Sequence, residues 1–104
     1  MRIEAAPSSD LPLDQSLSVK IKDLVILLVR TEAGLFALED TCPHASQSLA
    51  QGRVESTTLA CKHHGVQIDL RDGSLTRDMG FLYLEPAKVF SVSESDGMIF
   101  VDLP

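Results

Sequence analysis

Both cysteines and all three histidines of this 104-residue chain fall in the stretch Thr41–Leu70. They form two short pairs, Cys42-Pro43-His44 and Cys61-Lys62-His63-His64, which are separated by the sixteen residues 45–60. Each pair is short enough to reach one metal centre from a single loop. Thiolate and imidazole are also the side chains that bind borderline and soft metals well. The stretch therefore predicts a metal site, and the rest of the chain is expected to support it.

Several kinds of site can be made from two cysteines and two histidines. A mononuclear zinc site usually keeps like ligands close together, whereas each pair here mixes one sulfur with one nitrogen. A disulfide between Cys42 and Cys61 would leave the histidines unexplained, and no secretion signal is expected before them. A nucleophilic Cys–His site would make the second pair redundant, and two buried structural cysteines would not explain the matched spacing. The mixed order instead favours a two-iron cluster, and zinc stays open as the alternative.

The two pairs and their spacer resemble the signature of Rieske proteins, which is C-x-H, a spacer of similar length, and then C-x-x-H-G. The flanking segments Phe36–Asp40 and Asp69–Gly73 are similar to the strands beside the cluster in Rieske ferredoxins. The resemblance covers most of the chain from about Val25 onward. It implies one [2Fe-2S] cluster per chain.

The same resemblance assigns the cluster ligands residue by residue. It places two cysteines on the inner iron and two histidines on the outer, partly exposed iron; these are Cys42, Cys61, His44 and His64. His63 is not among them, because the two-residue spacing from Cys61 and the following Gly65 both select His64. We expect His63 to be a solvated or packing side chain beside the cluster.

Departures from the high-potential Rieske proteins predict a low potential. In those proteins two further cysteines form a disulfide, and here Gln47 and His63 stand in their places. They also carry a serine and a tyrosine that donate hydrogen bonds to sulfur, where this chain has Val66 and Ile68. Hydrogen bonds to the sulfurs stabilise the reduced cluster, so their loss lowers the potential. We predict about −150 mV rather than about +300 mV.

Length and composition predict one domain. With 104 residues and 44% hydrophobic content, residues 1–104 are long enough to bury a core, with a cluster-binding subdomain at about 41–70 and a basal β domain in the remainder. Rieske oxygenases add a catalytic domain whose iron is held by two histidines and a carboxylate. Once His44 and His64 are assigned, only His63 is left, so we expect an electron-transfer component and not an enzyme.

The charge narrows the choice of partners. With 15 acidic and 9 basic residues the formal net charge is -6, which disfavours binding to the phosphates of nucleic acid. An acidic surface suits transient docking on basic patches, or simply keeps a small protein in solution. The longest apolar run, Leu24–Val29, is too short to cross a membrane. With no membrane segment and no secretion signal, a cytoplasmic location is expected.

The remaining sequence predicts strands. Apolar and polar residues alternate over Leu17–Ile21, as in a half-buried strand, and the unbroken run Leu24–Val29 predicts a strand covered on both faces. Asp96-Gly97 is the strongest short hairpin signal. Further strands are expected at Arg2–Ala5, Leu35–Leu38, Arg53–Glu55, Thr58–Ala60, Gln67–Leu70, Lys88–Ser93 and Met98–Leu103. The predicted fold is all-β, a small antiparallel β-sandwich or barrel of the Rieske, ISP-like kind, with a hairpin-based cluster-binding subdomain.

The segment Arg77–Pro86 has two interpretations. By resemblance it takes the place of a third loop that covers the cluster, and its apolar part, Met79–Leu84, would then contribute to a docking face around the histidine ligands. Ordinary strand and core packing is the alternative that we favour.

The resemblance also implies a function. It predicts a soluble, low-potential Rieske ferredoxin that passes single electrons from a flavin-dependent NAD(P)H reductase to a terminal oxygenase for aromatic ring hydroxylation. Both partners would dock transiently at His44 and His64. Two alternatives stay open. One is the small Rieske-like subunit of an assimilatory nitrite reductase, and the other is a structural zinc or interaction module.

Overall fold

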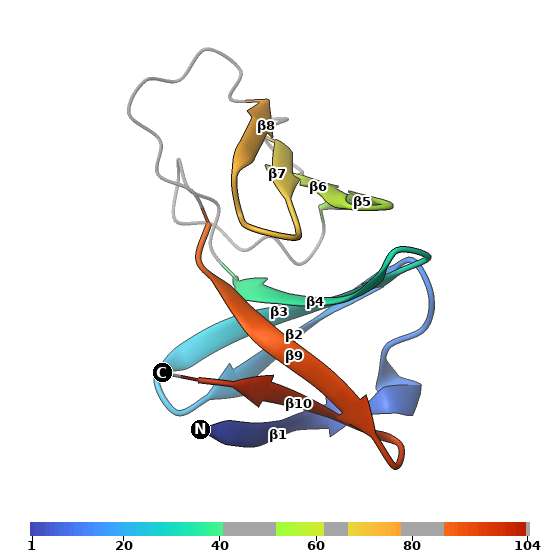
Figure 1. The fold of residues 1–104 in the computed structure, drawn as a ribbon, viewed down its shortest axis with the longest axis vertical. Helices are drawn as coiled ribbons and strands as arrows, with labels where there is room; N and C mark the ends of the chain where they lie inside the picture. Colours follow the sequence, from blue (N-terminus) through green and yellow to red (C-terminus); the bar gives the residue numbers. More distant parts are fainter. Residues whose placement is uncertain (41–51, 62–66, 78–86, 104) are drawn as a thin grey trace.

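The computed structural model describes residues 1–40, 52–61, 67–77 and 87–103. The strands in these ranges form two antiparallel sheets (Figure 1). In chain order they are β1 (Arg2–Pro7), β2 (Gln15–Ile21), β3 (Leu24–Thr31), β4 (Gly34–Glu39), β5 (Arg53–Glu55), β6 (Thr58–Ala60), β7 (Gln67–Asp69), β8 (Leu75–Arg77), β9 (Val89–Ser95) and β10 (Met98–Asp102). A single turn of 3-10 helix, η1 (Ser8–Asp10), follows β1. No helix in the described ranges is long and apolar enough to cross a membrane.

The larger sheet has six strands in the order β1-β10-β9-β4-β3-β2. The sheet is curled (Figure 1). All six strands contribute apolar side chains to one shared core. The buried residues of this basal core are Ala6, Leu11, Ile21, Ile26, Leu28, Ala37, Phe90, Ile99, Val101 and Leu103. The two ends of the described chain lie together, since the backbone N–H of Leu103 donates to the carbonyl oxygen of Met1 over 2.8 Å.

The smaller sheet has four strands in the order β5-β6-β7-β8 and stands over β3 and β4 (Figure 1). A second core fills the space between the sheets, and its buried residues are Leu27, Val29, Leu38, Leu59, Cys61, Ile68 and Leu70. Strand β3 serves both cores, because Ile26 and Leu28 face the basal core while Leu27 and Val29 face this inter-sheet core. The prediction of a strand covered on both faces is confirmed.

The hairpin signal in the last third of the chain is also confirmed. Ser95 pairs with Met98, so that Asp96 and Gly97 alone form the turn. Both residues have positive φ, 52° and 78°, as a two-residue hairpin with the twist of its strands requires. The predicted hairpin of Arg53–Glu55 and Thr58–Ala60 has the same bounds in the structure.

Three local predictions differ from the structure. The strand expected at Arg2–Ala5 continues to Pro7, which ends β1 opposite Met98, at a sheet edge where proline is tolerated. The strand expected at Leu35–Leu38 begins one residue earlier, because Gly34 pairs with Thr31 as the first residue of β4. Strand β8 was not predicted as an element of its own, and it pairs with β7 across a register shift. Its sequence, Leu75-Thr76-Arg77, places two polar residues after one apolar residue and so gives no alternation.

Candidate metal centre

Cys61 is the one predicted ligand that lies among the described residues, and it directly follows β6. Ala60 pairs with Gln67, so residues 61–66 connect two neighbouring strands as the C-x-x-H pair was predicted to do. The residue is only 2% exposed and belongs to the inter-sheet core. The other three predicted ligands, Cys42, His44 and His64, lie outside the described residues, as does His63.

The surroundings of Cys61 come from both sheets. Leu27, Val29 and Leu38 of the larger sheet and Leu59 and Ile68 of the smaller one form the same buried cluster. Apolar packing of this kind keeps water and its dielectric screening away from a sulfur ligand, which is one way in which a protein tunes a metal site. A shielded thiol at the base of a loop fits an iron–sulfur cluster, whose irons are held mainly by cysteine sulfur.

Ile68 bears on the predicted potential. It is completely buried in the inter-sheet core, and its side chain has no polar atom with which to donate a hydrogen bond to sulfur. Val66, the other position considered, lies outside the described residues, as do Gln47 and the segment 78–86 with its candidate docking residues Met79–Leu84.

The first predicted loop leaves the larger sheet at Asp40. The backbone N–H of Asp40 donates to the carbonyl oxygen of Val25 over 2.9 Å, and the Asp40 carboxylate Oδ2 accepts a hydrogen bond of 2.7 Å from Ser18 Oγ. The side chain is buried, with the residue 7% exposed. Residues 41–51 join β4 of the larger sheet to β5 of the smaller one. Asp40, the last described residue before them, is hydrogen-bonded to strands β2 and β3.

A second anchor lies in the turn between β7 and β8. Asp69 accepts hydrogen bonds from Arg71, with Oδ2 2.7 Å from Nη2 and Oδ1 2.9 Å from the backbone nitrogen. The Arg71 side-chain hydrogen bonds, helped by its backbone N–H, lower the pKa of Asp69 to about 2. Asp72 Oδ1 accepts from the Ser74 N–H over 2.9 Å, so both acidic side chains stabilise the turn.

Gly73 ties this turn to the larger sheet. Its carbonyl oxygen accepts a hydrogen bond of 2.8 Å from the Ala87 N–H, just before β9. Its φ of +80° is a conformation that favours glycine, and a Cβ built there would lie 1.9 Å from the Ala87 carbonyl oxygen. The approach of these two backbones leaves no space for a side chain.

Thr31 makes a second hydrogen-bonded connection between the sheets. Its hydroxyl donates to the Ser56 carbonyl oxygen in the β5–β6 turn over 2.6 Å and accepts from the Ala33 N–H over 3.0 Å. Sequence reasoning identified neither this contact nor the Asp40 and Gly73 anchors. The sequence signals that could have indicated them are the turn-forming residues of Arg71-Asp72-Gly73-Ser74 and an aspartate at the end of an apolar strand.

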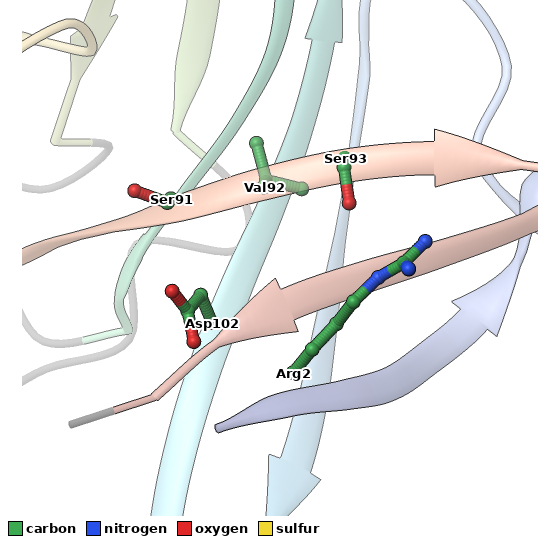
Figure 2. A pocket seen from close by; sticks show the side chains of 5 residues that line it. All are labelled: Arg2, Ser91, Val92, Ser93 and Asp102. Atoms are coloured by element: carbon green, nitrogen blue, oxygen red, sulfur yellow. The ribbon is translucent and has the colours of Figure 1, made fainter.

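A hollow of about 230 Å³ lies elsewhere, on the larger sheet. Figure 2 shows its lining side chains on β1, β9 and β10; they are Arg2, Ser91, Val92, Ser93 and Asp102. Its charged groups already have partners, because Arg2 stacks on Phe100 at 3.9 Å and Asp102 pairs with the N-terminal ammonium at 3.0 Å. In the region that the structure describes, this hollow does not belong to the surroundings of Cys61.

The family of this chain follows from its similarity to known proteins. The Rieske [2Fe-2S] domain family matches residues 1–80. The chain belongs to the Rieske family. Its cofactor is therefore one [2Fe-2S] cluster, and its chemistry is electron transfer.

Individual relatives of this Rieske protein point the same way. It is 29% identical over 104 residues to the 3-phenylpropionate/cinnamic acid dioxygenase ferredoxin subunit of Shigella flexneri, covering 99% of this chain and 94% of that relative. A solved ferredoxin in complex with the oxygenase of carbazole 1,9a-dioxygenase superposes with a TM-score of 0.83 at 23% identity, over 96% of this chain and 91% of the other. The Rieske protein is thus an electron-transfer component and not a catalytic enzyme.

The same fold occurs in a protein described as the small subunit of an NADPH nitrite reductase. It superposes with a TM-score of 0.83 at 16% identity over 99% of both chains. These superpositions confirm the predicted all-β Rieske fold. At such low identities they show the fold alone, so they do not separate a ferredoxin from a nitrite reductase subunit.

Proposed function

We propose that this Rieske protein is a low-potential ferredoxin that passes single electrons to a terminal oxygenase of an aromatic-ring dioxygenase system. Its source of electrons would be a flavin-dependent NAD(P)H reductase. The likeness to a dioxygenase ferredoxin subunit over nearly its whole length supports this role. The solved complex of a carbazole dioxygenase ferredoxin with its oxygenase supports docking of this kind. A cytoplasmic location and a single domain over residues 1–104 belong to the same proposal.

The proposed ligands are the two cysteines and two histidines selected by the signature. Cys42 and Cys61 would hold the inner iron, and His44 and His64 the outer one. When bound, the cluster supplies a centre that takes up and releases one electron at a time. The observation that carries the proposal is Cys61, a sulfur 2% exposed in the core between the two sheets of a Rieske fold.

The protein contributes burial on one side and exposure on the other. The apolar residues around Cys61 exclude water from the inner side of the site. The histidine ligands would present their other ring nitrogens to solvent or to a docked partner. Because the side chain of Ile68 cannot donate a hydrogen bond, the midpoint potential is expected near −150 mV, about the negative end of the Rieske range. A clearly positive midpoint in a redox titration would contradict this expectation.

Two neighbouring histidines allow a matched test of the ligand assignment. We expect His64→Ala to lose the Rieske absorption and the EPR signal of the reduced protein, while His63→Ala keeps both. Cys61→Ala should also lose them. If His64→Ala kept the native spectrum, or His63→Ala lost it, the assignment would be wrong. A colourless wild-type protein with one bound zinc would instead support the structural zinc alternative.

Electron delivery can be tested by mixing. Chemically reduced protein is mixed in a stopped-flow instrument with the oxidised terminal oxygenase of a 3-phenylpropionate/cinnamic acid dioxygenase, and reoxidation is followed by absorbance. The expected result is a rate that rises in proportion to oxygenase concentration, as for a transient collision. Reoxidation no faster than in buffer would count against this class of partner. Purification in a stable complex with a nitrite reductase would favour the subunit role.

A further inference from the structure

Asp40 interrupts the pattern of the strand that precedes it. Along β4, Phe36 and Leu38 face the inter-sheet core, and a period of two places residue 40 on the same face. The residue there is an aspartate, and it is buried. Burying a carboxyl group among apolar side chains is costly unless hydrogen bonds compensate. A departure from the local pattern of this kind is expected at functional sites.

The compensation comes from a strand that is not a neighbour of β4. Ser18 lies on β2, at the edge of the larger sheet, where it pairs with Leu27 of β3. Its hydroxyl reaches across β3 and donates to Asp40 Oδ2 over 2.7 Å. The main chain of Asp40 is held as well, through its N–H to the Val25 carbonyl oxygen at 2.9 Å. The residue is thus fixed at both its backbone and its carboxylate.

The position of this anchor in the chain gives it its significance. Asp40 is two residues before Cys42, the first proposed ligand, and a chain of two residues spans only about 7 Å when extended. The Cα atoms of Asp40 and Cys42 are therefore within about 7 Å of each other. A negative charge on a residue this near to a proposed ligand disfavours adding an electron to the cluster, because net charge around a cluster is one of the determinants of its potential.

We propose that Asp40 is a positioning residue for the first cluster loop, held by Ser18, and that its carboxylate helps to keep the potential low. This inference rests on the proposed ligand set. Ser18 would act in two ways. It fixes the orientation of the carboxylate, and its hydroxyl dipole offsets part of the negative charge.

Four variants test this inference through the midpoint potential, measured by protein-film voltammetry. Asp40→Asn keeps the size of the side chain and removes the charge, so the potential should shift to a more positive value. Ser18→Ala keeps the charge and removes the donor, so the shift should be negative. Ser18→Thr restores a hydroxyl with a side chain that suits a strand, and it should return the potential to the wild-type value. Ser93→Ala, an exposed serine on β9, is the matched control and should leave it unchanged.

The outcomes separate this inference from the proposed function. Opposite shifts for Asp40→Asn and Ser18→Ala, with rescue by Ser18→Thr, support it. An unchanged potential in both, or equal values for Ser18→Ala and Ser18→Thr, would overturn it. If Ser18→Ala fails to retain the cluster, retention by Ser18→Thr still supports the inference and loss in both overturns it. Failure of the ligand assignment shows separately, in the spectra of His63→Ala and His64→Ala.

Discussion

The two sheets of this molecule are stabilised in different ways. The larger sheet closes around its own core, and each of its six strands contributes to that core. The smaller sheet has four strands of three residues each, and its buried apolar residues pack against β3 and β4. A sheet of such short strands has little stability unless its apolar face packs against another element. The smaller sheet therefore depends on the larger one and on whatever its loops bind.

This difference suits a protein that holds a redox cluster. A self-sufficient base can fix the starting point of the first proposed cluster loop, which follows Asp40. The dependent layer is attached by the inter-sheet core, by the hydrogen bond from the Thr31 hydroxyl to Ser56 and by the backbone hydrogen bond from Ala87 to Gly73. Loops that are positioned by a rigid scaffold are the usual place for a functional site.

Removal of the cluster should give the largest effect on local stability, and the effect should differ between the two sheets. Bound metal contributes folding free energy to the elements that hold it. In the apoprotein we expect amide protection in β6 and β7 to fall by at least tenfold, about 1.4 kcal/mol of local stability, while amides of β3 and β10 remain protected. Hydrogen exchange read by mass spectrometry on holo- and apoprotein measures this. A uniform loss in both sheets would show that the base is not self-sufficient.

Two leucines on opposite faces of the larger sheet allow each core to be tested by itself. Leu28 is fully buried in the basal core and Leu38 in the inter-sheet core. Truncating either to alanine should cost about 2–5 kcal/mol of unfolding free energy. Only Leu38→Ala, which loosens the packing around Cys61, should also shift the midpoint potential. Urea denaturation and voltammetry on both variants decide this, and equal potentials would argue against a role of the inter-sheet core in tuning the cluster.

The same contrast explains what could be predicted from the sequence. Strand β3 and the Asp96-Gly97 hairpin were predicted because a continuous apolar run and a turn dipeptide are local signals. The ligand spacing is equally local, which is why a metal site at Cys42, His44, Cys61 and His64 could be predicted from the sequence alone. Of these four residues, only Cys61 lies in the described part of the chain, so only its burial bears on that prediction.

The hydrogen bonds and close contacts between residues far apart in the chain could not be predicted in this way. Ser18 and Asp40 are 22 positions apart, and Gly73 meets Ala87 only because two backbones from different sheets approach each other. Neither contact leaves a periodic or spaced pattern in the sequence. Strand β8 was missed for a related reason, since its three residues depend on pairing with β7.

Gly73 provides a test of the attachment itself, with Gly97 as a matched control. The two glycines have almost the same φ, +80° and +78°, but a Cβ at Gly97 would meet nothing within 4 Å. Replacing Gly97 by alanine should cost about 1 kcal/mol from backbone strain. Gly73→Ala should cost more than that, because it adds a clash with the Ala87 carbonyl oxygen. Equal losses of unfolding free energy would mean that the β7–β8 turn can move away from β9 without penalty.

Acid titration should give the smallest effect on stability. One carboxylate in each sheet should contribute to it. The pKa of Glu94 in the larger sheet is lowered to about 2 by hydrogen bonds from Arg30, whose Nη2 lies 2.5 Å from Oε2. The pKa of Asp69 in the smaller sheet is lowered to about 2 by Arg71. Each carboxylate therefore stabilises the fold above its ordinary pKa, and this contribution is lost as the pH falls toward about 2.

Charge-neutral variants identify the source of that loss. Between about pH 5 and about pH 2.5 the urea midpoint of the wild type should fall. It should fall less in Glu94→Gln and in Asp69→Asn, because an amide does not titrate. The effect is expected to be small, since the Arg30–Glu94 pair is partly exposed and water and salt weaken it. Exchange protection of β6 and β7 should respond to Asp69→Asn and not to Glu94→Gln. The reverse pattern would contradict the separation of the two sheets, because each ion pair would then act on the sheet to which it does not belong.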